Sequence, residues 1–216
     1  NTAIGYQAMK NTNSAAGSYN TAHGYQALYT NTTGTQNTAL GYQALYTNTT
    51  GIFNTAVGSF SLCKNTTGIQ NVAIGTCALY TNTIGIENVA LGYQALRLNT
   101  TGVNNTALGQ ESLTYNTTGV NNTGVGRRAL QSNTIGIENT SIGSAAMEAN
   151  TTGKCNVAVG FNSLKTNTIG TENTAIGNSA LYNNTTGKRN TAIGSKTLTA
   201  NTTGDSNTAI GAYAMF

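Results

Sequence analysis

A repeat of 17 residues is the feature of this sequence that most constrains its fold. Asparagine recurs at every seventeenth position from Asn20 to Asn207. With each coil numbered from position 0 at this asparagine, the residues follow, with few exceptions, the pattern N-[TV]-A-[ILV]-G-x-x-[AST]-[LM]-x-x-N-T-[TI]-G-x-x. Self-similarity at a fixed period indicates stacked repeats, each of which buries its apolar side chains against its neighbours.

The repeat also predicts the domain organisation. We expect one array over residues 1–216, with an irregular first coil at 1–19, eleven 17-residue coils at 20–206 and a partial last coil at 207–216. The first coil is two residues longer than the others, and its extra residues lie between Met9 and Gly17.

Two glycine columns predict the bends of each coil. Of the 26 glycines, 25 lie at positions 4 and 14, and only Gly124 does not. Glycine enters positive-φ conformations without steric cost, so we expect two fixed bends per coil. Asparagines at positions 0 and 11 can form hydrogen-bonded ladders along the stack. The predicted turn residues are Gly24, Gly34, Gly41, Gly51, Gly58, Gly68, Asn37 and Asn48.

Aliphatic residues alternate with small ones between the bends. Positions 1 and 3 of a strand share one face, and position 8 is always Leu or Met, so we expect these columns to point inward. Every charged residue falls at position 5, 6, 9, 10, 15 or 16, which we interpret as the outer surface. The predicted core columns are Leu28, Leu45, Leu62 and Leu79 at position 8, and Leu40, Val57 and Ile74 at position 3.

These patterns predict an all-β parallel solenoid of about 13 coils. A helix is disfavoured, because each glycine costs about 1 kcal/mol relative to alanine and the apolar spacing is not helical. Short parallel strands, with neighbouring coils about 4.8 Å apart, fit the repeat better.

Composition argues against several functions. Only 7% of residues are charged, and the basic residues are scattered along the chain with few adjacent pairs such as Arg127–Arg128, so we expect no nucleic-acid binding. No run of 18 apolar residues occurs, which predicts no membrane insertion of this segment. One histidine and six dispersed carboxylates offer no paired general base, so we expect no catalytic site, no cofactor and no metal. A disulfide between Cys63 and Cys77 is a minor alternative to three unpaired thiols.

The string N-T-A-I-G-Y-Q-A-L followed by N-T-T-G resembles the head repeats of trimeric autotransporter adhesins of the YadA kind. It resembles more closely the 17-residue arrays of phage-type tail-fibre proteins, and the likeness covers the whole chain. The resemblance implies a left-handed parallel β-roll with three chains side by side. It also implies an extracellular location on a cell or virion, and attachment to a receptor or glycan on a surface.

Three functions follow as expectations. The first is a non-catalytic structural or adhesive fibre shaft made of a homo-oligomer. The second is an extracellular filament whose subunits polymerise head to tail, since open solenoid ends present unpaired strand edges. The third is ice binding through threonines at positions 10 and 12, a rank that other residues interrupt.

Tyrosines and one histidine are the candidate contact residues. Tyr25 and Tyr42 at position 5, and Tyr29 and Tyr46 at position 9, suit ordinary surface positions, packing between chains or stacking on sugars. His23 replaces an aliphatic residue at position 3. We interpret His23 as a tolerated, at least partly buried histidine, with a metal or anion site in an oligomer as the alternative.

Overall fold

The computed structural model describes residues 1–12 and 17–215, and it divides into two compact units, residues 1–104 and 105–216. Among the described residues there are thirteen three-residue strands and no helix. The predicted all-β, parallel solenoid with a 17-residue period is confirmed. The single array over 1–216, its handedness and its oligomeric state stay predictions. The added length of the first coil falls partly on residues 13–16, which lie outside the described residues, as does Phe216.

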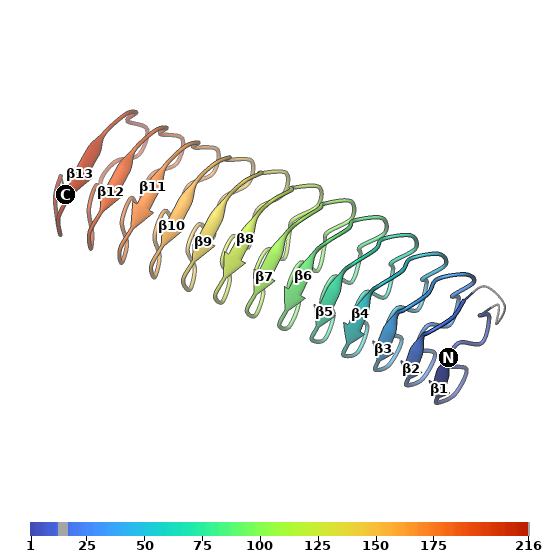
Figure 1. The fold of residues 1–216 in the computed structure, drawn as a ribbon. Coiled ribbons are helices and arrows are strands. Elements are labelled where there is room, and N and C mark those ends of the chain that lie inside the picture. Colours follow the sequence, from blue (N-terminus) through green and yellow to red (C-terminus); the bar gives the residue numbers. More distant parts are fainter. Residues whose placement is uncertain (13–16, 216) are drawn as a thin grey trace. The chain divides into compact units, whose positions relative to one another are not determined.

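Each unit is a parallel sheet in which every strand pairs with the strand one coil later, as in Thr38↔Thr55 and Thr174↔Thr191 (Figure 1). The strands of the first unit are β1 Thr2–Ile4, β2 Thr21–His23, β3 Thr38–Leu40, β4 Thr55–Val57, β5 Val72–Ile74 and β6 Val89–Leu91. Those of the second unit are β7 Thr106–Leu108, β8 Thr123–Val125, β9 Thr140–Ile142, β10 Val157–Val159, β11 Thr174–Ile176, β12 Thr191–Ile193 and β13 Thr208–Ile210.

The two glycine columns both lie against the next coil, but only position 4 has a positive φ. Gly41, at position 4, ends its strand with a φ of 138°, and a Cβ there would lie 2.6 Å from the carbonyl oxygen of Gly58. Gly51, at position 14, is not among the positive-φ residues. A Cβ on Gly51 would meet Asn48 Oδ1 and, at 2.5 Å, the carbonyl oxygen of Gly68. Glycine at position 14 is therefore required by close packing between coils, which corrects the expectation that both columns mark positive-φ bends.

Side-chain-bearing residues supply the remaining left-handed conformations. Gln43, Leu45 and Phe53, at positions 6, 8 and 16, have φ values of 51°, 51° and 59°. Each such residue carries a conformational cost of about 1–2 kcal/mol. These conformations let backbone N–H groups of one coil donate hydrogen bonds to both neighbouring coils. Gln43 N–H donates to the carbonyl of Tyr25 in the preceding coil at 2.9 Å, and Leu45 N–H donates to the carbonyl of Ser61 in the following coil at 3.0 Å.

The core differs from the prediction at the strands. Leu40 and Ile74 are 43% and 39% exposed and Val57 is half-exposed, whereas Ala39 between the strand ends of β3 is fully buried. The placement of Leu40, Val57 and Ile74 in the core is therefore wrong. The alternation of the strand is as expected, but position 2 is the inward position.

The physical reason is the narrow interior facing position 2. Ser141, at position 2 of its coil, donates its hydroxyl across the coil to the carbonyl of Ala146 at 2.8 Å. At Gly124, another position-2 residue, a Cβ would lie 2.6 Å from Ser112 Oγ. The space between the strand and the opposite wall therefore accommodates alanine or serine and excludes a branched aliphatic side chain.

Leucines and asparagines fill the rest of the interior. Leu28, Leu45, Leu62 and Leu79 are fully buried. Asn37 and Asn48 are also fully buried, and their Nδ2 groups both donate to the carbonyl of Gly51, at 2.8 Å and 3.0 Å. Asn48 Nδ2 donates further to Asn31 Oδ1 in the preceding coil at 2.8 Å. The core is thus half polar, and its amides are satisfied by ladders along the stack.

Candidate functional surfaces

In each unit the position-3 side chains form an exposed, mostly aliphatic surface that we call the outer stripe of that unit. In the first unit it comprises Ile4, His23, Leu40, Val57, Ile74 and Leu91. In the second unit it comprises Leu108, Val125, Ile142, Val159, Ile176, Ile193 and Ile210. Each of these side chains is exposed or half-exposed. Positions 1 and 3 carry no Lys, Arg, Asp or Glu in any coil, so the outer stripe is an apolar surface free of charge.

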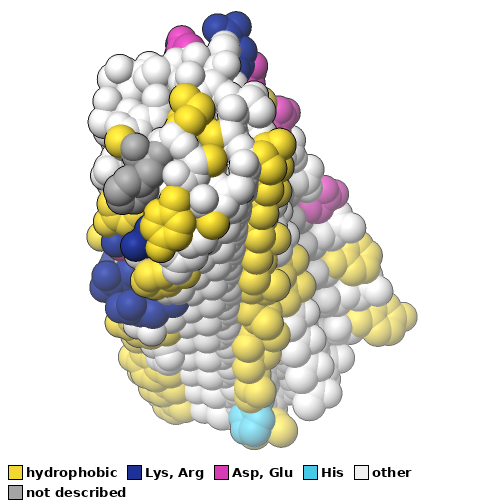
Figure 2. Space-filling model, turned by 90° about the vertical axis from the view of Figure 1, so that its left-hand side faces the viewer, with side chains coloured by type: hydrophobic (Ala, Val, Ile, Leu, Met, Phe, Trp, Pro, Cys, Tyr) yellow, Lys and Arg dark blue, Asp and Glu magenta, His cyan; other side chains and the backbone are white. Residues whose placement is uncertain are grey.

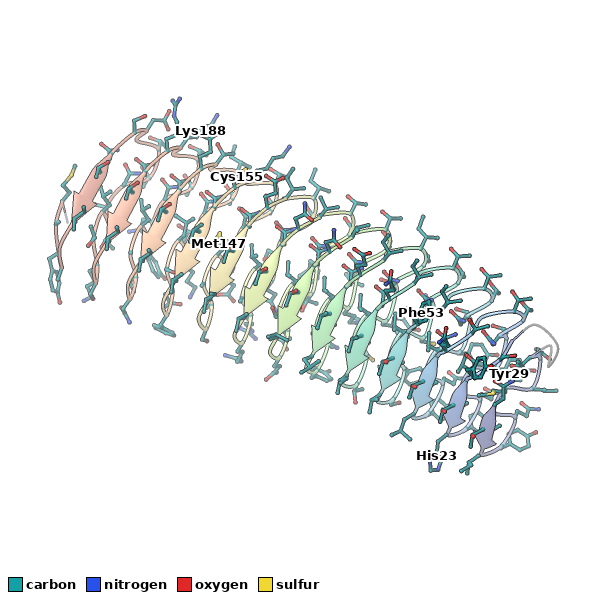
Figure 3. The ribbon with its side chains drawn as sticks, in the orientation of Figure 1. His23, Tyr29, Phe53, Met147, Cys155 and Lys188 are labelled. Carbon is teal, nitrogen blue, oxygen red and sulfur yellow. The ribbon has the colours of Figure 1, made fainter. Side chains whose placement is uncertain are left out.

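His23 belongs to this outer stripe and not to the core. Its side chain is exposed and projects from β2 away from the coil, because position 3 points outward (Figure 3). Hydrophobic side chains adjoin this histidine on the surface (Figure 2). The expected burial of His23 is therefore wrong. Among residues 1–12 and 17–215, no three His, Cys, Asp or Glu side chains are grouped as metal ligands.

The first unit carries a second surface, which we call the aromatic corner. Tyr25 and Tyr42 are 42% and 46% exposed, and their rings stack with centroids 5.1 Å apart and an interplanar angle of 5°. Tyr29 and Tyr46 form a parallel stack at 5.1 Å. Tyr29 lies on a different side of the coil from His23 (Figure 3). The corner consists of Tyr6, Tyr25, Tyr29, Tyr42, Tyr46, Phe60 and Tyr80.

Phe60 contacts one tyrosine at position 5 and one at position 9, a role that the sequence interpretation missed. Its ring meets Tyr42 at 5.1 Å and Tyr80 at 6.2 Å, in both cases edge to face. Phe60 lies at position 6, whereas Tyr42 lies at position 5 and Tyr80 at position 9. One sequence signal could have indicated this role. Phe60 is the only phenylalanine at position 6, and it lies between coils that have tyrosine at positions 5 and 9.

Two lysines and a ladder of glutamine amides lie beside these rings. Lys10 and Lys64 place their Nζ atoms 5.7 Å and 5.2 Å from the ring centroids of Tyr29 and Tyr80. Gln26 Nε2 donates to Gln7 Oε1 at 2.9 Å, and Gln43 continues this amide ladder at 2.8 Å. Residues 1–86 contain no aspartate or glutamate.

The second unit carries an ionic corner at the same repeat positions. Arg128 Nε lies 2.9 Å from Glu111 Oε2, and Arg128 Nη1 lies 3.8 Å from Glu148. Lys165 Nζ approaches Glu148 at 3.5 Å. These residues occupy positions 6 and 9 of four successive coils. The hydrogen bond from Arg128 lowers the pKa of Glu111 below its ordinary value.

No family model, curated protein or solved structure matches the chain. The outer stripe, the aromatic corner and the ionic corner are therefore the features from which a function is inferred.

The threonine hydroxyls at positions 10 and 12 donate hydrogen bonds to neighbouring coils. Thr30, at position 10, donates its hydroxyl to the carbonyl of Tyr46 at 2.9 Å. Thr32, at position 12, donates to Thr49 at 2.9 Å, and Thr49 donates to Thr66 at 3.0 Å. These hydroxyl protons bind the next coil's backbone, so the columns that suggested ice binding stabilise the solenoid.

The three cysteines are unpaired, so Cys63 and Cys77 form no disulfide. Burial raises the pKa of the Cys63 thiol to about 11. Cys155 is exposed as a residue. Partial desolvation of its thiol, together with a hydrogen bond to Glu138, raises the pKa of that thiol. None of the described segments forms a helix with the length and apolarity that crossing a membrane requires.

Proposed function

We propose that this chain is a non-catalytic structural and adhesive shaft segment of an extracellular cell-surface or virion fibre, built from three laterally associated copies. The observation that carries the proposal is the outer stripe. Exposed surface positions ordinarily vary in polarity, yet position 3 is aliphatic in every coil except that of His23. An exposed apolar surface of this regularity favours a partner that covers it.

A second copy of the same chain suits the outer stripe for two physical reasons. Its stripe has the same spacing, about 4.8 Å per coil, so aliphatic side chains of two copies can interdigitate along the whole contact. Both surfaces are free of charge, so their burial incurs no penalty for desolvating an unpaired ion. Apolar area is thereby removed from water at about 25 cal/mol per Å².

Light scattering coupled to size-exclusion chromatography tests this association. Wild-type protein is expected to have the mass of three chains. The paired substitutions Ile74→Glu and Ile176→Glu place a carboxylate on the outer stripe of each unit and are expected to yield folded single chains. The matched control, Thr76→Glu with Asn178→Glu, adds the same charge two residues further along the same coils, at exposed position 5, and is expected to remain trimeric.

A folded wild-type monomer would contradict the proposal, as would a stripe variant that keeps the wild-type mass. Electron microscopy distinguishes the alternative function. Short particles of uniform length are expected for a laterally associated shaft, whereas long filaments formed by this chain alone would favour head-to-tail polymerisation.

A further inference from the structure

The aromatic corner of the first unit is a different surface from the outer stripe. It lies at positions 5, 6 and 9, whereas the stripe lies at position 3. Tyr25 and Tyr42 are nearly half exposed. The hydroxyls of Tyr25 and Tyr42 make no hydrogen bond to another described residue. A contiguous cluster of exposed aromatic rings favours a partner that packs on it.

Ring geometry decides what the corner can bind. Parallel rings in face-to-face contact lie about 3.5–4 Å apart. The Tyr25 and Tyr42 centroids are 5.1 Å apart with nearly parallel planes, so the rings are slipped along one another. Each ring therefore leaves part of its face and its hydroxyl edge accessible. Repetition at each coil produces a ribbon of partial ring faces that follows the stacking axis of the unit, from Tyr6 to Phe60.

We propose that this corner binds an extended, unbranched, β-1,4-linked acidic polysaccharide that lies along the stacking axis. The C–H faces of pyranose rings pack on aromatic faces, and a chain with this linkage advances per sugar by nearly the distance between coils. Its hydroxyl groups find donors and acceptors in the tyrosine hydroxyls and in the Gln7–Gln26–Gln43 amide ladder.

Charge selects an acidic chain over a neutral one. Lys10 and Lys64 lie over two rings of the corner, three coils apart. No carboxylate occurs in residues 1–86 to neutralise these lysines or to repel an anionic ligand. Sugar carboxylates placed beside the aromatic ribbon would pair with both ammonium groups. The proposal is independent of the oligomeric state, because the stripe and the corner occupy different positions of the repeat.

Isothermal titration calorimetry of the full chain with polymannuronate, cellohexaose and dextran tests the proposal. Polymannuronate is acidic and β-1,4-linked, cellohexaose has the same linkage without charge, and dextran has a different linkage. We expect binding of polymannuronate, weaker binding of cellohexaose and none of dextran. Tyr25→Ser with Tyr42→Ser is expected to weaken polymannuronate binding about tenfold or more, since each ring contributes a stacking contact.

Serine is already present at position 5 in Ser144 and Ser195, so the two substitutions suit the fold. Circular dichroism and light scattering should show unchanged folding and mass, which separates this test from that of lateral association. The matched control Phe161→Ser removes an exposed aromatic residue at position 5 of the second unit and is expected to leave binding unchanged.

Lys10→Gln with Lys64→Gln is expected to weaken polymannuronate binding and leave cellohexaose binding unchanged. Three outcomes would overturn the proposal: wild-type protein that binds neither β-1,4-linked probe, a tyrosine variant that binds polymannuronate as tightly as wild type, or a Phe161→Ser variant that loses as much affinity as the tyrosine variant.

Discussion

The aromatic corner of the first unit and the ionic corner of the second share repeat positions 6 and 9 but differ in chemistry. Tyr25 and Tyr42 stack in one, whereas Glu111 and Arg128 pair in the other. Beneath both of these pairs, position 8 is a fully buried leucine and position 11 a fully buried asparagine. Folding of the coil therefore restricts the residues of its interior but not those of its corner. Substitutions at the corner should affect binding and solubility, whereas substitutions in the shared interior should affect folding.

The largest effect is expected from the shared interior. Leu79→Ala and Leu181→Ala each remove a fully buried side chain, one in each unit, and should each cost about 2–5 kcal/mol in the free energy of unfolding. Denaturant titration should give the same loss for both at any protein concentration.

The outer stripe provides the comparison for those leucines. Ile74→Ala and Ile176→Ala change exposed side chains, so their effect should depend on protein concentration, because it acts through association. An Ile74→Ala loss that equals that of Leu79→Ala and does not vary with concentration would contradict the outward assignment of position 3.

A smaller loss is expected from the asparagine ladders. Asn48→Ala and Asn150→Ala leave buried partners without donors, and should each cost about 1–3 kcal/mol, again equally in the two units. Thr50→Ala, at an exposed position, is the control and should change stability little. A clear difference between Asn48→Ala and Asn150→Ala, measured by thermal unfolding, would show that the two interiors are not equivalent.

The two units also differ in thiol reactivity. Cys63 is buried, and its pKa is raised from 9.0 to about 11, so its alkylation by iodoacetamide should remain slow until the pH approaches that value. Exposed Cys155 should react faster at every pH, which mass spectrometry of the labelled peptides would measure.

The same shift affects stability. Between pH 9 and 11 the folded state holds the Cys63 proton that the unfolded state releases, so rising pH favours unfolding. Cys63→Thr, a residue that position 9 accepts at Thr114, should remove this contribution. Equal labelling rates for Cys63 and Cys155 would contradict the buried assignment.

The smallest effect is expected at the ionic corner. Arg128→Gln removes the partner of Glu111 and Glu148, and the resulting fall in melting temperature should be slight and should vanish at high salt. Because the pKa of Glu111 is lowered, the stabilisation is present at neutral pH and is lost as the pH falls through the carboxylate range. Lys64→Gln in the first unit should show no comparable acid dependence of stability, since residues 1–86 hold no carboxylate.

The repeat made the solenoid predictable, and position 8 and both asparagine columns lie inside as their pattern suggested. Position 3 points outward although it carries no charge, because the interior volume and not the absence of charge decides which side chains are buried. Ala39 fits between the walls of the coil, whereas Leu40 does not. A charge-free exposed stripe and a buried one have the same sequence pattern, and only the side-chain volumes distinguish them.

The corner residues were only partly predictable. Tyr25, Tyr29, Tyr42 and Tyr46 were recognisable from their columns, but Phe60 was not, because its bridging contacts join different repeat positions in three coils. The left-handed conformations of Leu45 and Gln43 had no sequence signal, since these residues rarely adopt a positive φ. Backbone hydrogen bonds to the coils on either side stabilise these conformations.

Electron paramagnetic resonance of a spin label on the outer stripe tests the central claim most directly. In a chain with Cys63→Thr, Cys77→Ser and Cys155→Ser, a label at Ile176→Cys is compared with one at Asn178→Cys, two residues along the same coil. The account predicts dipolar broadening at position 176 that disappears on dilution with unlabelled chain, and a much weaker interaction at position 178. A sharp, dilution-independent spectrum at position 176 would contradict it.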